Sequence, residues 1–322
     1  MSPQDIAALS GASRAMYAIA HMIHDKLPST VSNLVAVPTY TTSYRKTLLT
    51  YNYDAWPRLC LWARIPYGVK YEPGKAKMRL HSTSDVSGLA HVHQLEIFDC
   101  DNISDVSMLG QIHTLRISAC RRIMDVRALG TVHTLRLYAC MNVRNVSALG
   151  GVHNLSLSGC FRVVDVCSLG TVHTLDLSNT SVVDTSALGN VHMLNLSYCA
   201  GVTDVSALGS VHTLILRCTR ISDVSALCNV HTLNLNQCSN VVDVSTLGRV
   251  HTLNLSYCHY IEDVSALGGV HTLDLSHCRS ISDIGALVDV QWLRIVGCKI
   301  RVGLNVLDRI PTVISHPELT IL

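Results

Sequence analysis

Residues Val250 to Gly269 read V-H-T-L-N-L-S-Y-C-H-Y-I-E-D-V-S-A-L-G-G, and this stretch recurs down the chain. Its histidine returns every 20 residues, with a step of 19 in two places: His93, His113, His133, His153, His173, His192, His212, His231, His251 and His271. A fixed period in this range is typical of a solenoid, in which each unit stacks only on its neighbours. We therefore expect one array of stacked units with an N-terminal appendage.

Composition agrees with a long aliphatic core. Of the 322 residues, 48% are hydrophobic and 15% are charged, and there are two Phe. No apolar run approaches the ~20 residues that a membrane-spanning helix needs. The first 25 residues contain Asp5 and lack a positively charged start before an apolar run, so we expect no signal peptide. With no such signal, the 13 Cys favour free thiols in a reducing, cytoplasmic compartment.

The L-x-L segment of each unit predicts a short strand whose two leucines point inward while the residue between them points outward. These strand centres fall at residues 95, 115, 135, 155, 175, 194, 214, 233, 253, 273 and 293, and at Val313 in a final degenerate unit. The Val or Ile after the Cys, the Val of D-V-S and the Leu of A-L-G complete the predicted core.

The spacing V-x-x-L-x-L-x-x-C resembles the leucine-rich repeat over roughly residues 75 to 315. The stretch around Cys238, Val241 and Asp243 is similar to the cysteine-containing repeats of F-box/leucine-rich-repeat proteins, whereas D-V-S-A-L is similar to internalin repeats. Arrays this uniform also resemble those of expanded gene families in large amoebal DNA viruses. The resemblance implies an α/β solenoid with a curved parallel β-sheet on its concave side and short helical or 3-10 turns on its convex side.

Three regions are expected: an N-terminal helical cap over 1–75, about 12 coils over 76–315, and a tail over 316–322. Ser2 and Pro3 predict the start of a helix from about residue 3 to 26. The run D-I-A-A-L-S-G-A-S-R-A-M-Y from Asp5 to Tyr17 resembles the second half of an F-box, although the first half has no counterpart. The alternative interpretation is a helix that shields the first coil.

Four rows of identical side chains follow from the repeat. A row of Cys is replaced by Thr180 and Thr219 in the 19-residue units, which favours a structural role for the row over zinc, because zinc needs four converging ligands. A row of Asp, with Asn145 once, predicts caps of short helical turns. A row of Gly predicts left-handed turns. The His row predicts neutral imidazoles about 4.8 Å apart that bond to turn backbone, with pKa values below ~6.5. Scattered metal binding by this row is the lesser alternative.

Function is then left to the variable outward positions. The candidates for partner binding are aromatic, charged or basic residues expected on the concave face: Glu96, Phe98, Arg116, Arg136, Tyr138, Asp176, Tyr198, Arg217, Tyr257, His277, Trp292 and Arg294. Outside the Asp row, residues 81–300 hold 13 basic and 7 acidic side chains. We therefore expect an acidic protein partner, with nucleic acid as the lesser option because the net charge is +2.

No motif in the sequence indicates an enzyme. A phosphate-binding glycine loop, H-E-x-x-H and G-x-S-x-G are all absent. We expect no catalytic, cofactor or metal site. The predicted function is a non-enzymatic protein-interaction scaffold, and the alternative is an F-box-like substrate receptor of a ubiquitin ligase, with residues 3–26 docking the adaptor. A third possibility is a secreted or surface repeat protein like the internalins.

Overall fold

The structure is a computed structural model that describes residues 69–72, 77–81, 86 and 93–315. The chain forms two compact units, residues 1–143 and 144–322. The predicted helix at 3 to 26, the F-box-like run and the tail 316–322 lie outside the described residues. Positions within a coil are numbered 1 to 20 from Val250 to Gly269, so position 2 is His251, position 9 is Cys258 and position 14 is Asp263.

The first unit opens with an antiparallel pair and continues with parallel strands. Strand β1 pairs antiparallel with β2, and β2 to β5 are parallel and in register, with Leu95 opposite Leu115. The elements in order are β1 Val69–Glu72, β2 Lys77–His81, β3 Gln94–Phe98, η2 Ser107–Gln111, β4 Thr114–Ser118, η3 Arg127–Thr131 and β5 Thr134–Tyr138. The η elements are 3-10 helices.

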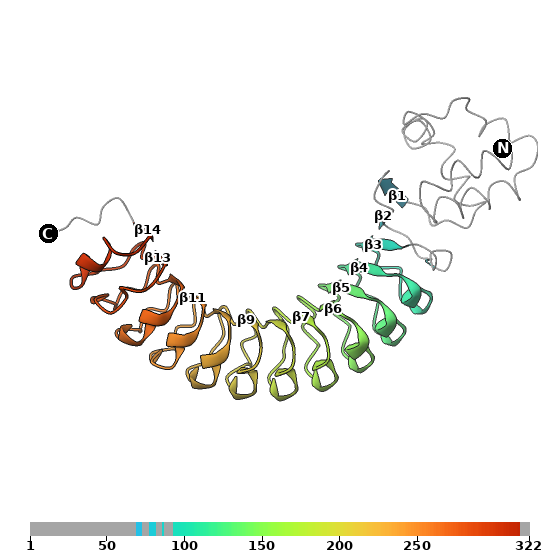
Figure 1. Ribbon diagram of the computed structural model, residues 1–322. Helices are drawn as coiled ribbons and strands as arrows, with labels where there is room; N and C mark the ends of the chain where they lie inside the picture. Colours follow the sequence, from blue (N-terminus) through green and yellow to red (C-terminus); the bar gives the residue numbers. More distant parts are fainter. Residues whose placement is uncertain (1–68, 73–76, 82–85, 87–92, 316–322) are drawn as a thin grey trace, which may run out of the picture. The chain divides into compact units, whose positions relative to one another are not determined.

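The second unit repeats one strand and one tight turn per coil. Its elements are η4 Ser147–Gly151, β6 Asn154–Ser156, η5 Cys167–Leu169, β7 Thr174–Asp176, η6 Ser186–Leu188, β8 Met193–Asn195, η7 Ser206–Leu208, β9 Thr213–Ile215, η8 Ser225–Asn229, β10 Thr232–Asn234, η9 Leu247–Arg249, β11 Thr252–Asn254, η10 Ser265–Gly269, β12 Thr272–Asp274, β13 Trp292–Arg294, η11 Leu304–Val306 and β14 Thr312–Ile314. Within this unit the strands lie on the inner side of the arc of coils and the 3-10 helices on its outer side (Figure 1).

The predicted parallel sheet and its register are confirmed. Thr252 lies opposite Thr272 and Leu253 opposite Leu273, so each repeat position pairs with the same position one coil on. The core consists of the aliphatic residues at positions 1, 4, 6, 12, 15 and 18, almost all of which are at most 5% exposed. None of the helices that the structure describes has the length and apolar content needed to cross a bilayer.

The expected role of the glycine row was wrong. Gly170, Gly189 and Gly209 have right-handed backbone conformations, with φ near −60°. The reason for glycine is a close approach: a Cβ on Gly189 would lie 2.5 Å from the carbonyl oxygen of Ala207 in the next coil. Coils pack against one another so closely at this turn that a side chain has no room.

The left-handed residue of each coil is instead position 8, just before the Cys. Nine non-glycine residues there have positive φ, from 49° to 64°: Asp99, Ala119, Ala139, Asn179, Tyr198, Cys218, Gln237, Tyr257 and His277. Gly159 and Gly297 hold the same place in two other coils. The backbone N–H of Tyr257 still donates to the carbonyl of Ser276 at 2.8 Å, so inter-coil bonding extends through this turn. The backbone at position 8, where the strand side of each coil ends, is therefore held in one conformation.

Candidate functional site: the strand face

The side chains at positions 3, 5, 7 and 8 form the surface that we call the strand face. Every predicted partner-binding residue lies at one of these positions, but they belong to two units: Glu96, Phe98, Arg116, Arg136 and Tyr138 to the first, and the other seven to the second. Within each unit, successive coils place the same position side by side because the strands are in register. The candidates therefore form short rows instead of one convergent cluster.

Position 5 of the second unit is mostly occupied by structural Asp and Asn. The Oδ1 atom of Asp274 accepts the backbone N–H of Ser276 at 2.9 Å, and Asn254 does the same for Ser256. In Asp176, Oδ1 accepts the N–H of Ser178 at 3.0 Å while Oδ2 accepts the Ser156 hydroxyl at 3.0 Å. The carboxylate of Asp176, a predicted binding residue, is thus already engaged in holding its own strand end.

On the strand face of the second unit, position 8 carries exposed aromatic rings and position 7 carries Arg217. Tyr198 is 49% exposed and Tyr257 is 39% exposed. The guanidinium of Arg217 lies over the Tyr198 ring, 5.6 Å from its centroid. Aromatic and Arg side chains held on a rigid backbone are the types that dominate binding energy at interfaces.

A second aromatic group lies further along the same face. The rings of Tyr257 and His277 stack with centroids 4.4 Å apart, and His259 meets Tyr257 edge-on at 6.2 Å. The Nδ1 atom of His259 lies 2.9 Å from the carbonyl oxygen of His277, which fixes the histidine beside the tyrosine. Beyond it, Arg294 at position 5 lies 4.0 Å from Asp274, and Trp292 at position 3 is half-buried.

The strand face of the first unit is basic. Arg116 and Arg136 lie opposite each other on β4 and β5, and Arg116 also lies over the Phe98 ring at 5.5 Å. Tyr138 is 54% exposed beside them. Glu96 was predicted to point outward, but its side chain is 5% exposed.

The cysteine row is structural. Cys258 and Cys278 lie in successive coils, and their thiols donate to the carbonyl oxygens of Leu235 and Leu255 at 3.1 and 3.0 Å, each one coil back. Burial raises the pKa of Cys278 to about 12. Thr180 bonds to Leu177 through its hydroxyl at 2.6 Å, as expected for a residue that replaces the thiol. In the described part of the chain, no three His, Cys, Asp or Glu side chains are grouped so that they could share a metal ion.

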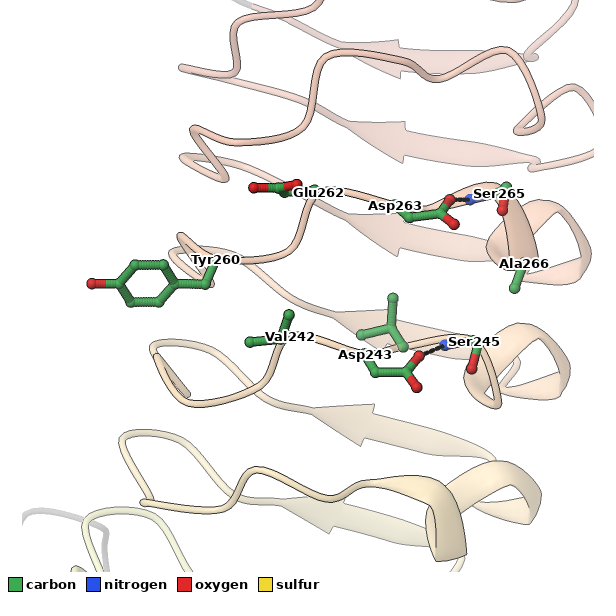
Figure 2. Close-up of a pocket in the computed structure, with 9 residues that line it drawn as sticks. Val242, Asp243, Ser245, Tyr260, Glu262, Asp263, Ser265 and Ala266 are labelled. Carbon is green, nitrogen blue, oxygen red and sulfur yellow. Dashed lines mark hydrogen bonds between the residues drawn. The ribbon is translucent and has the colours of Figure 1, made fainter.

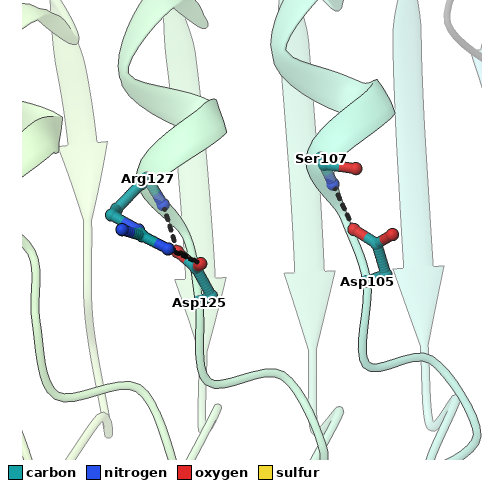
Figure 3. A network of polar contacts seen from close by, with 4 residues as sticks. All are labelled: Asp105, Ser107, Asp125 and Arg127. Atoms are coloured by element: carbon teal, nitrogen blue, oxygen red, sulfur yellow. Dashed lines mark hydrogen bonds and ion pairs between the residues drawn. The ribbon is translucent and has the colours of Figure 1, made fainter.

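The aspartate row bonds to the start of the 3-10 turns, although the N-cap residue is the one after each Asp, such as Val106 and Val126. The Oδ1 atom of Asp105 accepts the N–H of Ser107 at 2.8 Å, and that of Asp125 accepts the N–H of Arg127 at 3.0 Å (Figure 3). The Arg127 guanidinium, 2.6 Å from Asp125, is the main cause that lowers the pKa of this carboxyl to about 2. The backbone N–H of the capped residue lowers the pKa of Asp105.

A shallow cavity of about 410 Å³ lies beside the capped turns of two coils, away from the strand face. Figure 2 shows Asp243 and Asp263 side by side there, each bonded to its serine, with Tyr260 and Glu262 at the rim. Because the carboxylates are already bonded to the turns, the cavity offers a polar wall without a convergent catalytic set.

The histidine row is present in both units. All its rings are exposed, and within each unit neighbouring centroids lie 4.5 to 4.8 Å apart, for example 4.5 Å between His251 and His271. The expected bond to turn backbone is replaced by a contact with the next side chain, since Nδ1 of His271 lies 3.1 Å from the Thr272 hydroxyl. The sequence signal for this partner was the Thr at position 3.

Similarity to solved structures was found for the fold. An internalin from Listeria monocytogenes (InlF) matches with a TM-score of 0.54 and 18% identity, covering 74% of this chain and 86% of that one. The described chain is a leucine-rich repeat solenoid. The functional domain of InlJ from the same organism, which includes a cysteine ladder, matches with a TM-score of 0.44 and 16% identity over 68% of this chain and 62% of that one. Internalin C2 gives 0.37 and 19%, over 62% of this chain and 80% of that one.

No protein-family model and no curated protein matches this sequence. At 18% identity the internalin comparison concerns the fold alone.

Proposed function

We propose that this leucine-rich repeat solenoid is a non-enzymatic scaffold that binds a partner protein on its strand face. The observation that carries the proposal is the row at positions 7 and 8 of the second unit. There Tyr198 with Arg217, and Tyr257 with His277, stand on backbone fixed by inter-coil hydrogen bonds. Side chains that are ordered before binding lose little conformational entropy on association.

Most other features of the repeat already have a structural task. The Cys row bonds to backbone, the Asp row bonds to the start of the 3-10 turns and the position-5 Asp and Asn residues hold strand ends. The variable aromatic and basic groups have no such task, which supports a role in recognition.

An acidic surface on the partner is the chemistry that fits best. In the first unit Arg116 and Arg136 are adjacent on the strand face. A reducing compartment is the place where we expect the scaffold to work, because thiols of the Cys row, such as those of Cys258 and Cys278, serve as donors to backbone carbonyls.

The test is affinity purification of the full chain from the cell that expresses it, followed by mass spectrometry. A double variant, Tyr198→Asn with Tyr257→Asn, removes both rings and keeps a residue that position 8 accepts, since Asn179 occupies it naturally. The matched control is Tyr260→Asn, which removes a 63% exposed ring that lies outside the strand face.

The proposal predicts a partner that the wild type and the Tyr260 control capture and the double variant loses. Capture that survives the double variant but not the control would place binding on the loop side instead. A co-purified ubiquitin-ligase adaptor would support the substrate-receptor alternative. Charge reversal of Arg116 and Arg136 tests the acidic partner, with reversal of Arg121 and Arg122 on an exposed loop as control.

A further inference from the structure

The histidine file of the second unit is the most regular exposed feature of the molecule. It consists of His153, His173, His192, His212, His231, His251 and His271, whose consecutive ring centroids are 4.5 to 4.8 Å apart. From His212 to His271 the neighbouring planes differ by only 10° or 11°. All seven side chains are exposed, and the file runs along the start of the strands, beside position 3 of the strand face.

Each of the last four rings is held by the same partner. The distances from Nδ1 to the hydroxyl oxygen of the following Thr are 3.3 Å for His212 and His231, 3.2 Å for His251 and 3.1 Å for His271. When Nδ1–H donates to that oxygen, the lone pair of the ring lies on Nε2. Metal-binding histidines are oriented in this way, with the second ring nitrogen donating to a fixed acceptor.

We propose that neighbouring imidazoles of this file bind divalent transition metal ions, such as Zn²⁺ or Ni²⁺, through paired Nε2 atoms. A metal–nitrogen bond measures about 2.0–2.1 Å, so two Nε2 atoms on one ion lie at most ~4.2 Å apart. Near-parallel rings point their Nε2 lone pairs in the same direction, so rings whose centroids are 4.5 or 4.6 Å apart share an ion only when each tilts by roughly 40° toward the other. Water completes the coordination.

The sequence favoured a structural histidine row, with scattered metal binding as the lesser alternative. Two protein ligands per ion suffice for exchangeable binding at a surface. Each pair of neighbouring imidazoles in the histidine file provides two. Pairing the four rings from His212 to His271 gives about two ions, each with two imidazoles.

Thiols in the same unit are poorly suited to compete with the imidazoles for the metal ion. The thiol of Cys278 is buried and burial raises its pKa, so it does not supply a thiolate at neutral pH. Desolvation lowers the pKa of His251, and the charges of His271 and His231 act in the same direction, which favours the neutral form of the imidazole.

The test is a calorimetric titration of the full chain, without an affinity tag, with Ni²⁺ at pH 7.5. We expect saturable binding that loses about two equivalents when His212, His231, His251 and His271 are all changed to Gln. The control is His259→Gln, which removes a histidine outside the file and should leave the stoichiometry unchanged. Circular dichroism verifies that the variants keep the fold, and His251→Gln alone serves if the quadruple variant does not fold.

A second readout separates ordered pairs from scattered surface histidines. The double variant Thr252→Val with Thr272→Val keeps both rings and removes their hydroxyl partners, so the Kd for Ni²⁺ at this pair should rise about 10- to 100-fold. Cu²⁺ in place of Ni²⁺ should show two coordinated imidazole nitrogens by electron paramagnetic resonance. Absence of Ni²⁺ binding to the wild type, or stoichiometry unaffected by the quadruple variant, would overturn the proposal.

Discussion

Changing Gly189 to Ala tests the close approach between coils. The backbone at Gly189 has φ −60° and ψ −23°, a conformation that alanine adopts without strain. Without a steric clash, the substitution would stabilise the chain by about 0.4–1 kcal/mol, because it restricts the conformations of the unfolded state. The new Cβ, however, would lie 2.5 Å from the carbonyl oxygen of Ala207.

Restoring an ordinary contact of 3.4 Å needs a displacement of about 0.9 Å between two backbone segments. Both are constrained: the Ser210 hydroxyl donates to the Gly189 carbonyl at 2.7 Å, and the Leu188 carbonyl accepts the N–H of Val191 at 3.1 Å. Overpacking of this kind costs typically about 1–3 kcal/mol. The net expectation is a loss of about 1–2 kcal/mol, since the steric cost exceeds the entropic gain.

Urea titration followed by circular dichroism measures this loss, and Gly285→Ala is the matched control. A Cβ on Gly285 would meet the Asp283 side chain at 3.1 Å and no backbone atom closer than 3.8 Å, so this variant should be neutral or slightly stabilised. Equal midpoints for the two variants would refute the argument from inter-coil contact.

Three further outcomes are expected. The melting temperature should be lower at pH 5.5 than at pH 7.5, because His212 and His251 have pKa values below 6.5 when folded. Their contribution to stability is full above pH 6.5 and falls as acid titrates the rings. Equal melting temperatures at the two pH values would contradict this. Asp243→Ala should lower the urea midpoint while Asp243→Asn preserves it, because Oδ1 of residue 243 accepts the N–H of Ser245 at 2.9 Å. Leu253→Ala should cost about 2–5 kcal/mol in the same assay, since Leu253 is 1% exposed.

The sequence was sufficient to predict the structural features that recur in every coil. Period and the L-x-L spacing placed the strands, including the last at Val313, because burial of the same positions in every coil imposes the pattern. The Cys row was also predictable, since Thr180 substitutes for the thiol as a donor to backbone.

The backbone conformation of the turns was harder to predict from the sequence. Glycine at position 19 was assigned a left-handed turn, yet its cause is an oxygen from the next coil, which cannot be seen within one repeat. The left-handed position 8 holds Tyr198, Gln237 and His277 as well as glycines, so its composition conceals its φ. Gly159, Gly297 and Asn179 were the available signal.

The sequence predicted the positions of the candidate site residues within the coil, but not which of their side chains are accessible to a partner. Tyr198, Arg217 and Tyr257 lie on the strand face as expected. Asp176, however, is occupied by Ser156 and Ser178, and Glu96 is buried, because contacts with neighbouring coils decide which outward side chains remain accessible.

Amide hydrogen exchange of the chain with and without its captured partner tests the central proposal most directly. Binding on the strand face predicts slower exchange in segments that carry positions 5 to 8, such as 195–198 and 254–257, with unchanged exchange in the turns 204–209 and 263–268. Protection confined to those turns, with the strand segments unaffected, would contradict it.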